Sequence, residues 1–103
     1  MNRIALIFVA ALAACATTDP PESTMASART MVAQARPVAQ QNAPAELAVA
    51  QDKLARAETA MQRGHYEHAR MLAEEAEADA RLAWITSERV RTERALQEER
   101  NIR

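Results

Sequence analysis

Cysteine, glycine and aromatic residues are scarce in this chain of 103 residues. It contains one Cys, one Gly, one Trp, one Tyr and one Phe. A single cysteine excludes a disulfide within the chain and deprives a zinc site of its usual thiolate ligands. The few aromatic residues predict thin helix contacts instead of a large hydrophobic core.

The only purely apolar run lies at the start of the chain. Ile4 to Ala14 follow the positive Arg3 without interruption and end in small residues, which is the layout of a secretory signal peptide. At ~1.5 Å per residue the run covers about 16 Å, too little to cross ~30 Å of hydrocarbon. We therefore predict a signal peptide over residues 1–14, removed between Ala14 and Cys15.

The lone cysteine comes directly after this run. It has three interpretations: an intermolecular disulfide, an incidental thiol or a lipidation site. The tetrapeptide Leu-Ala-Ala-Cys ending at Cys15 resembles a bacterial lipobox. This resemblance implies a diacylglyceryl group and an N-acyl chain (such as palmitate) on Cys15, with residues 15–19 as lipidated cysteine and short tether. Ala16 resembles the sorting residue of outer-membrane lipoproteins, which implies a lipid-anchored, periplasm-facing protein of a Gram-negative outer membrane.

The charge balance argues against a nucleic-acid partner. Loss of residues 1–14 removes Arg3, one of 13 basic side chains, and none of the 14 acidic ones. The mature chain is therefore slightly acidic and has no basic nucleic-acid footprint.

The remaining residues predict an all-α fold. Ala, Glu, Arg, Gln and Leu are strong helix formers, and the prolines stand only between Pro20 and Pro44. A first helix over 20–36 begins with Asp19 as N-cap and Pro20 in the first turn. Pro37 is expected to end or kink it and to open a break over 37–43. The apolar stripe of this helix is Met25, Ala28, Val32 and Ala35.

Residues 44–101 predict a long antiparallel helical hairpin, so the whole is a three-helix, coiled-coil-like protein. Pro44 suits a first turn, and Gly64 a left-handed cap, with Tyr66 just beyond the hairpin turn. Coiled-coil spacing marks the buried stripe of each half. These stripes are Leu47, Ala50, Leu54, Ala57 and Met61, then Ala69, Ala73, Ala76, Ala80 and Ala83.

A second apolar group lies nearly opposite the alanine stripe of the last helix. At about 100° per residue its members lie close together, with Trp84 to one side of the alanine stripe. They are Met71, Ala78, Leu82 and Ile85. Three interpretations remain open: the first helix folds over this face, the face binds a partner or a second copy of the chain, or its members are isolated exposed apolar residues, which are common on protein surfaces.

The hairpin resembles a family of alanine-rich helical lipoproteins, the domain of unknown function 4398 family. The matching features over residues 43–89 are Pro44-Ala45-Glu46-Leu47, Lys53-Leu54, Ala57, Gly64, Tyr66, Ala69, Leu72-Ala73-Glu74, Ala76, Asp79-Ala80 and Leu82-Ala83. Some members of that family carry an OmpA-like domain, which implies an OmpA-like or other envelope protein as partner.

The sequence predicts no enzyme and no cofactor beyond the lipid on Cys15. Ser23, Ser27 and Ser87 stand outside any strained elbow or glycine-rich loop, and thin helices rarely form a catalytic pocket. His65 and His68 suggest a remote metal-handling alternative, but no third ligand is arranged near them. We expect a lipid-anchored, non-enzymatic interaction or adaptor module, with a self-associating coiled-coil spacer as the alternative.

Overall fold

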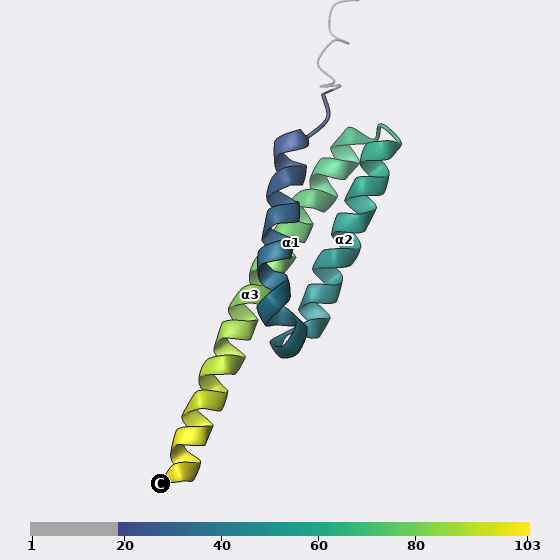
Figure 1. Ribbon diagram of the computed structural model, residues 1–103. Coiled ribbons are helices and arrows are strands. Elements are labelled where there is room, and N and C mark those ends of the chain that lie inside the picture. The colour runs from purple at the N-terminus through teal and green to yellow at the C-terminus, as the bar shows by residue number, and fades with distance from the viewer. Residues whose placement is uncertain (1–18) are drawn as a thin grey trace, which may run out of the picture.

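The computed structural model describes residues 19–103, which form three α-helices packed side by side (Figure 1). Helix α1 spans Glu22–Asn42, α2 spans Pro44–Gln62 and α3 spans Tyr66–Ile102. Each helix contacts the other two. The predicted all-α hairpin with an additional N-terminal helix is therefore confirmed. The predicted signal peptide, its cleavage site at Ala14 and Cys15, and the tether up to residue 18 lie outside the described residues.

A single glycine closes the turn between α2 and α3. Gly64 has a φ of 74°, a left-handed conformation that glycine adopts without steric cost. Its N–H donates to the Met61 carbonyl at 3.1 Å, and the His65 N–H donates to the Ala60 carbonyl at 2.9 Å. This is a Schellman motif, which satisfies the last carbonyls of α2 and reverses the chain within three residues. Tyr66 then begins α3.

The first helix starts later and ends later than the sequence predicts. It begins at Glu22 with Pro21 as N-cap, because Pro21 disfavours the α conformation of Pro20 before it. The predicted end at Arg36 and the predicted break over 37–43 are wrong: α1 continues through Pro37 to Asn42. Ala35 and Ala39 on either side of Pro37 are fully buried, so packing holds the helix together although the ring removes one hydrogen bond.

The actual break between α1 and α2 is the single residue Ala43. Its φ of −151° is extended, as expected for a residue that precedes a proline. Ala43 donates its N–H to the Ala39 carbonyl at 2.9 Å and accepts the Leu47 N–H at 3.1 Å. Asn42 donates its side-chain amide to the Val38 carbonyl at 2.8 Å. One residue thus ends one helix and begins the next.

The core is a seam of small residues along α3, on which α1 and α2 both pack. The seam alanines of α3 are fully buried, and Ser87 closes the row. Most of the facing residues are also alanine, which lets helix axes approach the lower end of the usual 8–10 Å. The buried α3 residues are Ala69, Leu72, Ala73, Ala76, Ala80, Ala83 and Ser87. Facing them are Met25, Ala28, Val32, Ala35 and Ala39 of α1, and Leu47, Ala50, Ala57 and Ala60 of α2.

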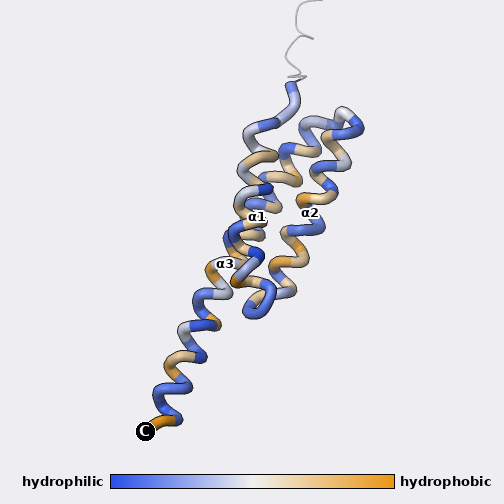
Figure 2. Tube along the Cα trace, viewed as in Figure 1, coloured by the Kyte–Doolittle hydropathy of each residue, from blue (hydrophilic) through white to orange (hydrophobic). Residues whose placement is uncertain are grey.

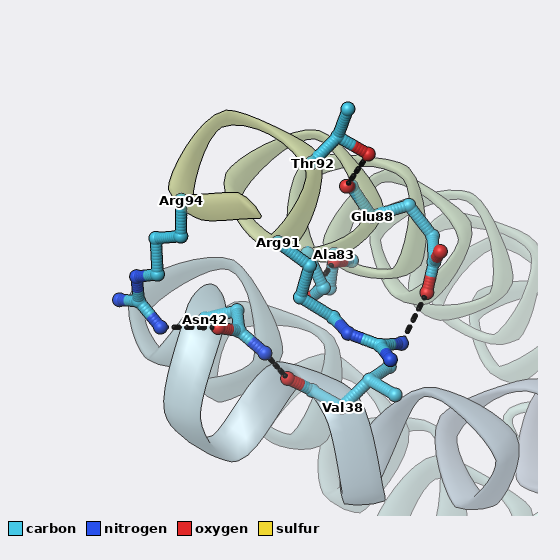
Figure 3. A network of polar contacts seen from close by, with 8 residues as sticks. Val38, Asn42, Ala83, Glu88, Arg91, Thr92 and Arg94 are labelled. Carbon is cyan, nitrogen blue, oxygen red and sulfur yellow. Dashed lines mark hydrogen bonds and ion pairs between the residues drawn. The ribbon is translucent and has the colours of Figure 1, made fainter. Parts of the chain in front are cut away.

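Helix α3 extends well beyond the other two helices (Figure 1). Every residue from Arg91 to Arg103 is exposed, and this part is mostly hydrophilic (Figure 2). One hydrogen bond joins its base to the α1–α2 turn, from the Arg94 guanidinium to the side-chain Oδ1 of Asn42 at 2.8 Å (Figure 3). We call residues 91–102 the α3 extension. An isolated helix of such a length is marginally stable in water.

The alanine seam yields a prediction about packing. Replacing Ala76, which is fully buried, by Leu should lower the free energy of unfolding by about 1–3 kcal/mol, because the close helices have no room for three more carbons. The matched Ala95→Leu change in the exposed α3 extension should alter it by less than about 0.5 kcal/mol. Urea unfolding followed by circular dichroism measures both. Equal stability of the two variants would contradict the tight seam.

Candidate functional site

One face of α3 points away from α1 and α2 and is apolar. The exposed fractions are 47% for Met71, 52% for Leu82, 58% for Ile85 and 50% for Leu96, and Ala78 between them is also exposed. At about 100° per residue these five side chains fall within an arc of about 60°. We call this set the outer face. It extends over about 38 Å of helix at ~1.5 Å per residue.

Helix α1 does not cover the outer face, so the first of the three interpretations from sequence is wrong. α1 packs with Met25, Ala28 and Val32 into the two core clusters around the alanine seam, on the opposite side of α3. Helix α1 packs on the alanine seam because the small alanine side chains allow both α1 and α2 to approach α3 closely on the same side. The outer face is left without a covering element among residues 19–103.

Trp84 does not belong to the outer face. Its side chain is 38% exposed and lines a hollow with Met31 and Gln34 of α1, on the flank of α3 where α1 lies. The predicted partner surface of Met71, Ala78, Leu82, Trp84 and Ile85 therefore divides into four outer-face residues and one residue at the α1–α3 groove.

Two exposed apolar residues near this surface lie outside the partner surface predicted from sequence. Leu96 continues the outer face and stands 14 residues after Leu82, so the heptad spacing contained its signal. Val49 of α2 is 47% exposed and lines a hollow with Leu82 and Asp79. The residue spacing within α2 does not identify Val49, because Val49 comes close to Leu82 only when α2 packs against α3.

An ion-pair network borders the outer face where α2 meets α3. Lys53 Nζ of α2 lies 2.7 Å from Asp79 Oδ2 and 3.6 Å from Glu75 Oε2 of α3. The hydrogen bond to Asp79, the Asp79 charge and the Glu75 charge raise the pKa of Lys53 above 10.5, against a smaller effect of burial. Elsewhere Arg29 of α1 pairs with Glu58 of α2 at 2.9 Å. These contacts fix the helices laterally and leave the outer face open.

The two histidines lie beside the Gly64 turn. His65 and His68 are exposed and line a hollow with Arg56, Thr59 and Arg63. Within residues 19–103 no group of three His, Cys, Asp or Glu side chains is arranged to hold a metal ion. None of the three helices described is long and apolar enough to cross a bilayer.

A family model described as Domain of unknown function (DUF4398) matches residues 23–100. The chain belongs to the DUF4398 family. The match runs from the second residue of α1 into the α3 extension, so it includes α1, which the sequence resemblance over residues 43–89 left out. No curated protein and no solved structure matches the chain significantly. For this DUF4398 member, function must therefore be argued from its own surfaces.

The raised pKa of Lys53 predicts how stability responds to alkaline pH. A lysine whose pKa is higher in the folded state stabilises the fold below 10.5 and loses that contribution as pH rises through the folded-state pKa. Lys53→Arg should flatten this loss, because arginine stays charged throughout the range. The measurement is the melting temperature from about pH 9 to about pH 12. The same alkaline decline in wild type and Lys53→Arg would show that Lys53 does not cause it.

Proposed function

We propose that this protein is a lipid-anchored lipoprotein of a Gram-negative outer membrane, facing the periplasm. In this proposal Cys15 carries the diacylglyceryl and N-acyl groups, and the protein acts as a non-enzymatic helical interaction or adaptor module. The observation that carries the interaction role is the outer face: Leu82 and Ile85 are more than half exposed in a helix whose inward residues are mostly alanine. Protein surfaces with contiguous apolar patches bind partners or membranes.

The geometry of the chain is compatible with an anchor at Cys15. The start of α1 and the Gly64 turn lie at the same end of the bundle (Figure 1). Asp19 is the fourth residue after Cys15, and four residues reach at most about 14 Å. An anchored Cys15 therefore holds this end of the bundle close to the bilayer. The outer face then stays accessible along α3.

Two occupants of the outer face are consistent with its chemistry. One is another envelope protein, and the family resemblance points to an OmpA-like protein. The other is a second copy of this chain, which makes the protein a self-associating spacer. The heptad spacing of Met71, Ala78 and Ile85, with Leu82 and Leu96 between and beyond them, favours a helix as occupant, because such spacing is the seam of a coiled coil.

The lipid anchor is tested by the intact mass of the protein from fractionated envelopes. We expect wild type to carry a mass increase equal to a diacylglyceryl and an acyl group on a chain beginning at Cys15, and to collect in the outer-membrane fraction. Cys15→Ser should lack the modification and leave that fraction, since a triacylated anchor binds far more tightly than one chain. An unmodified wild-type mass would refute the anchor.

The interaction role is tested in intact envelopes with a photo-reactive residue in place of Ile85. We expect a crosslinked protein product whose yield falls when Leu82 is also changed to Glu, because a carboxylate disrupts an apolar contact. The same photo-reactive residue in place of the exposed Gln40 of α1 is the matched control. Equal crosslinking at both positions, or none at Ile85, would contradict a binding role for the outer face.

A further inference from the structure

We infer that the outer face of α3 binds the outer face of a second copy of this chain, with the two α3 helices antiparallel. This inference rests on the proposed interaction role of the outer face and names its occupant. It does not depend on the lipid anchor.

The spacing provides a continuous coiled-coil seam. Outer-face residues and the polar residues between them follow alternating steps of four and three along α3. The complete row is Met71, Glu75, Ala78, Leu82, Ile85, Arg89, Thr92 and Leu96. The bulky aliphatic pair of Leu82 and Ile85 stands in the middle of this row, and an apolar residue stands at either end. Leu82 is 52% and Ile85 58% exposed, so a second helix has side chains to bury.

An antiparallel arrangement pairs this row with itself favourably. If Leu82 lies beside Ile85 of the second copy, then Met71 lies level with Leu96 of that copy and Ala78 with Arg89. The arginine thus meets the smallest residue of the row, whose size leaves its long side chain room. The Arg89 guanidinium then reaches the Glu75 carboxylate of the second copy, which lies about one helical turn from that Ala78. A two-fold axis repeats each of these contacts.

The charges of α3 also favour the antiparallel direction. Residues 66–81 contain five acidic and two basic side chains, whereas residues 88–103 contain four acidic and five basic ones. Antiparallel helices place the acidic half of each copy against the basic half of the other. Parallel helices place Glu75 against Glu75 and Arg89 against Arg89, and like charges at a helix interface destabilise it. On the flank of the row, Arg81 would lie near Glu88 of the second copy.

The shape of the bundle supports the same arrangement. In this register the α3 extension of one copy lies beside residues 65–76 of the other, where α1 and α2 support the helix from behind. The extension has no packing partner within residues 19–103, since every residue from 91 onward is exposed. The second copy supplies that packing. Because the start of α1 lies at the turn end of each bundle, the starts of the two α1 helices lie at opposite ends of the dimer.

Sedimentation of the full-length chain carrying Cys15→Ser, over a wide range of concentration, tests the association. We expect a reversible dimer whose dissociation constant rises at least about 30-fold on Leu82→Glu, as for a central contact residue. The matched control is Ile102→Glu, the same kind of change at an 86%-exposed residue of α3 outside the outer face. It should leave dissociation unchanged. Circular dichroism verifies that both variants remain folded.

The direction of the helices is tested by disulfide formation in the same Cys15→Ser background. A mixture of Met71→Cys and Leu96→Cys chains should form a mixed disulfide, whereas Met71→Cys alone should not crosslink to itself. Arg89→Glu should weaken the dimer about tenfold, and the double change Glu75→Arg with Arg89→Glu should restore it. In a parallel dimer the double change restores nothing, because identical charges still face each other.

Each result decides the proposal. Efficient self-crosslinking of Met71→Cys would establish a parallel dimer and overturn the antiparallel one. Failure of the charge reversal to restore association would overturn the pairing of Arg89 with Glu75 of the second copy. A monomer at every concentration would overturn self-association altogether. The proposed interaction role of the outer face would still stand in that case if the photo-reactive residue at Ile85 crosslinks to a different envelope protein.

Discussion

The close approach of three helices along an alanine seam is the constraint on which the rest of this structure depends. Short inward side chains allow a helix to approach two others closely on one side. Ala73, Ala76 and Ala80 satisfy this condition because each presents a single methyl group to both neighbours. Burial of so little apolar surface per residue stabilises each contact weakly. The bundle therefore relies on the length of its helices and on few larger core residues, namely Met25, Val32, Leu47 and Leu72.

The same seam explains why the large apolar residues of α3 point outward. In most amphipathic helices the bulky aliphatic side chains face the core and the small or polar ones face solvent. α3 reverses this order: alanine faces α1 and α2, and Met71, Leu82 and Ile85 face away from them. Their positions are not irregular, because these residues follow a separate heptad row on α3. A second row of this kind on one helix is typical of a helix that packs against two sets of neighbours.

The sequence predicts the stripes of this fold better than it predicts their partners. Periodicity identified the buried rows of all three helices, because a helix repeats its contacts every three or four residues whatever it packs against. It did not reveal which α3 row α1 would cover, because both rows are apolar and the outer one is the more hydrophobic. At Pro37 a local rule failed: the fully buried Ala35 and Ala39 hold the helix on the seam and outweigh one missing hydrogen bond. The sequence could not identify Val49 as part of this surface, since Val49 lies near Leu82 only after α2 and α3 have packed.

The α3 extension connects the core to the proposed function. Helix α1 ends and helix α2 begins at Ala43, where a single extended residue and the Asn42 hydrogen bonds turn the chain. Beyond this level α3 continues without neighbours within residues 19–103, held at its base by Arg94 and Asn42 (Figure 3). A charged helix without packing is marginal by itself, yet it grows from a bundle that has already paid the cost of helix nucleation. It therefore needs only modest additional contacts to become fully ordered. The outer face of another α3, with its opposite distribution of charge, provides contacts of that strength and leaves the alanine seam of each bundle undisturbed.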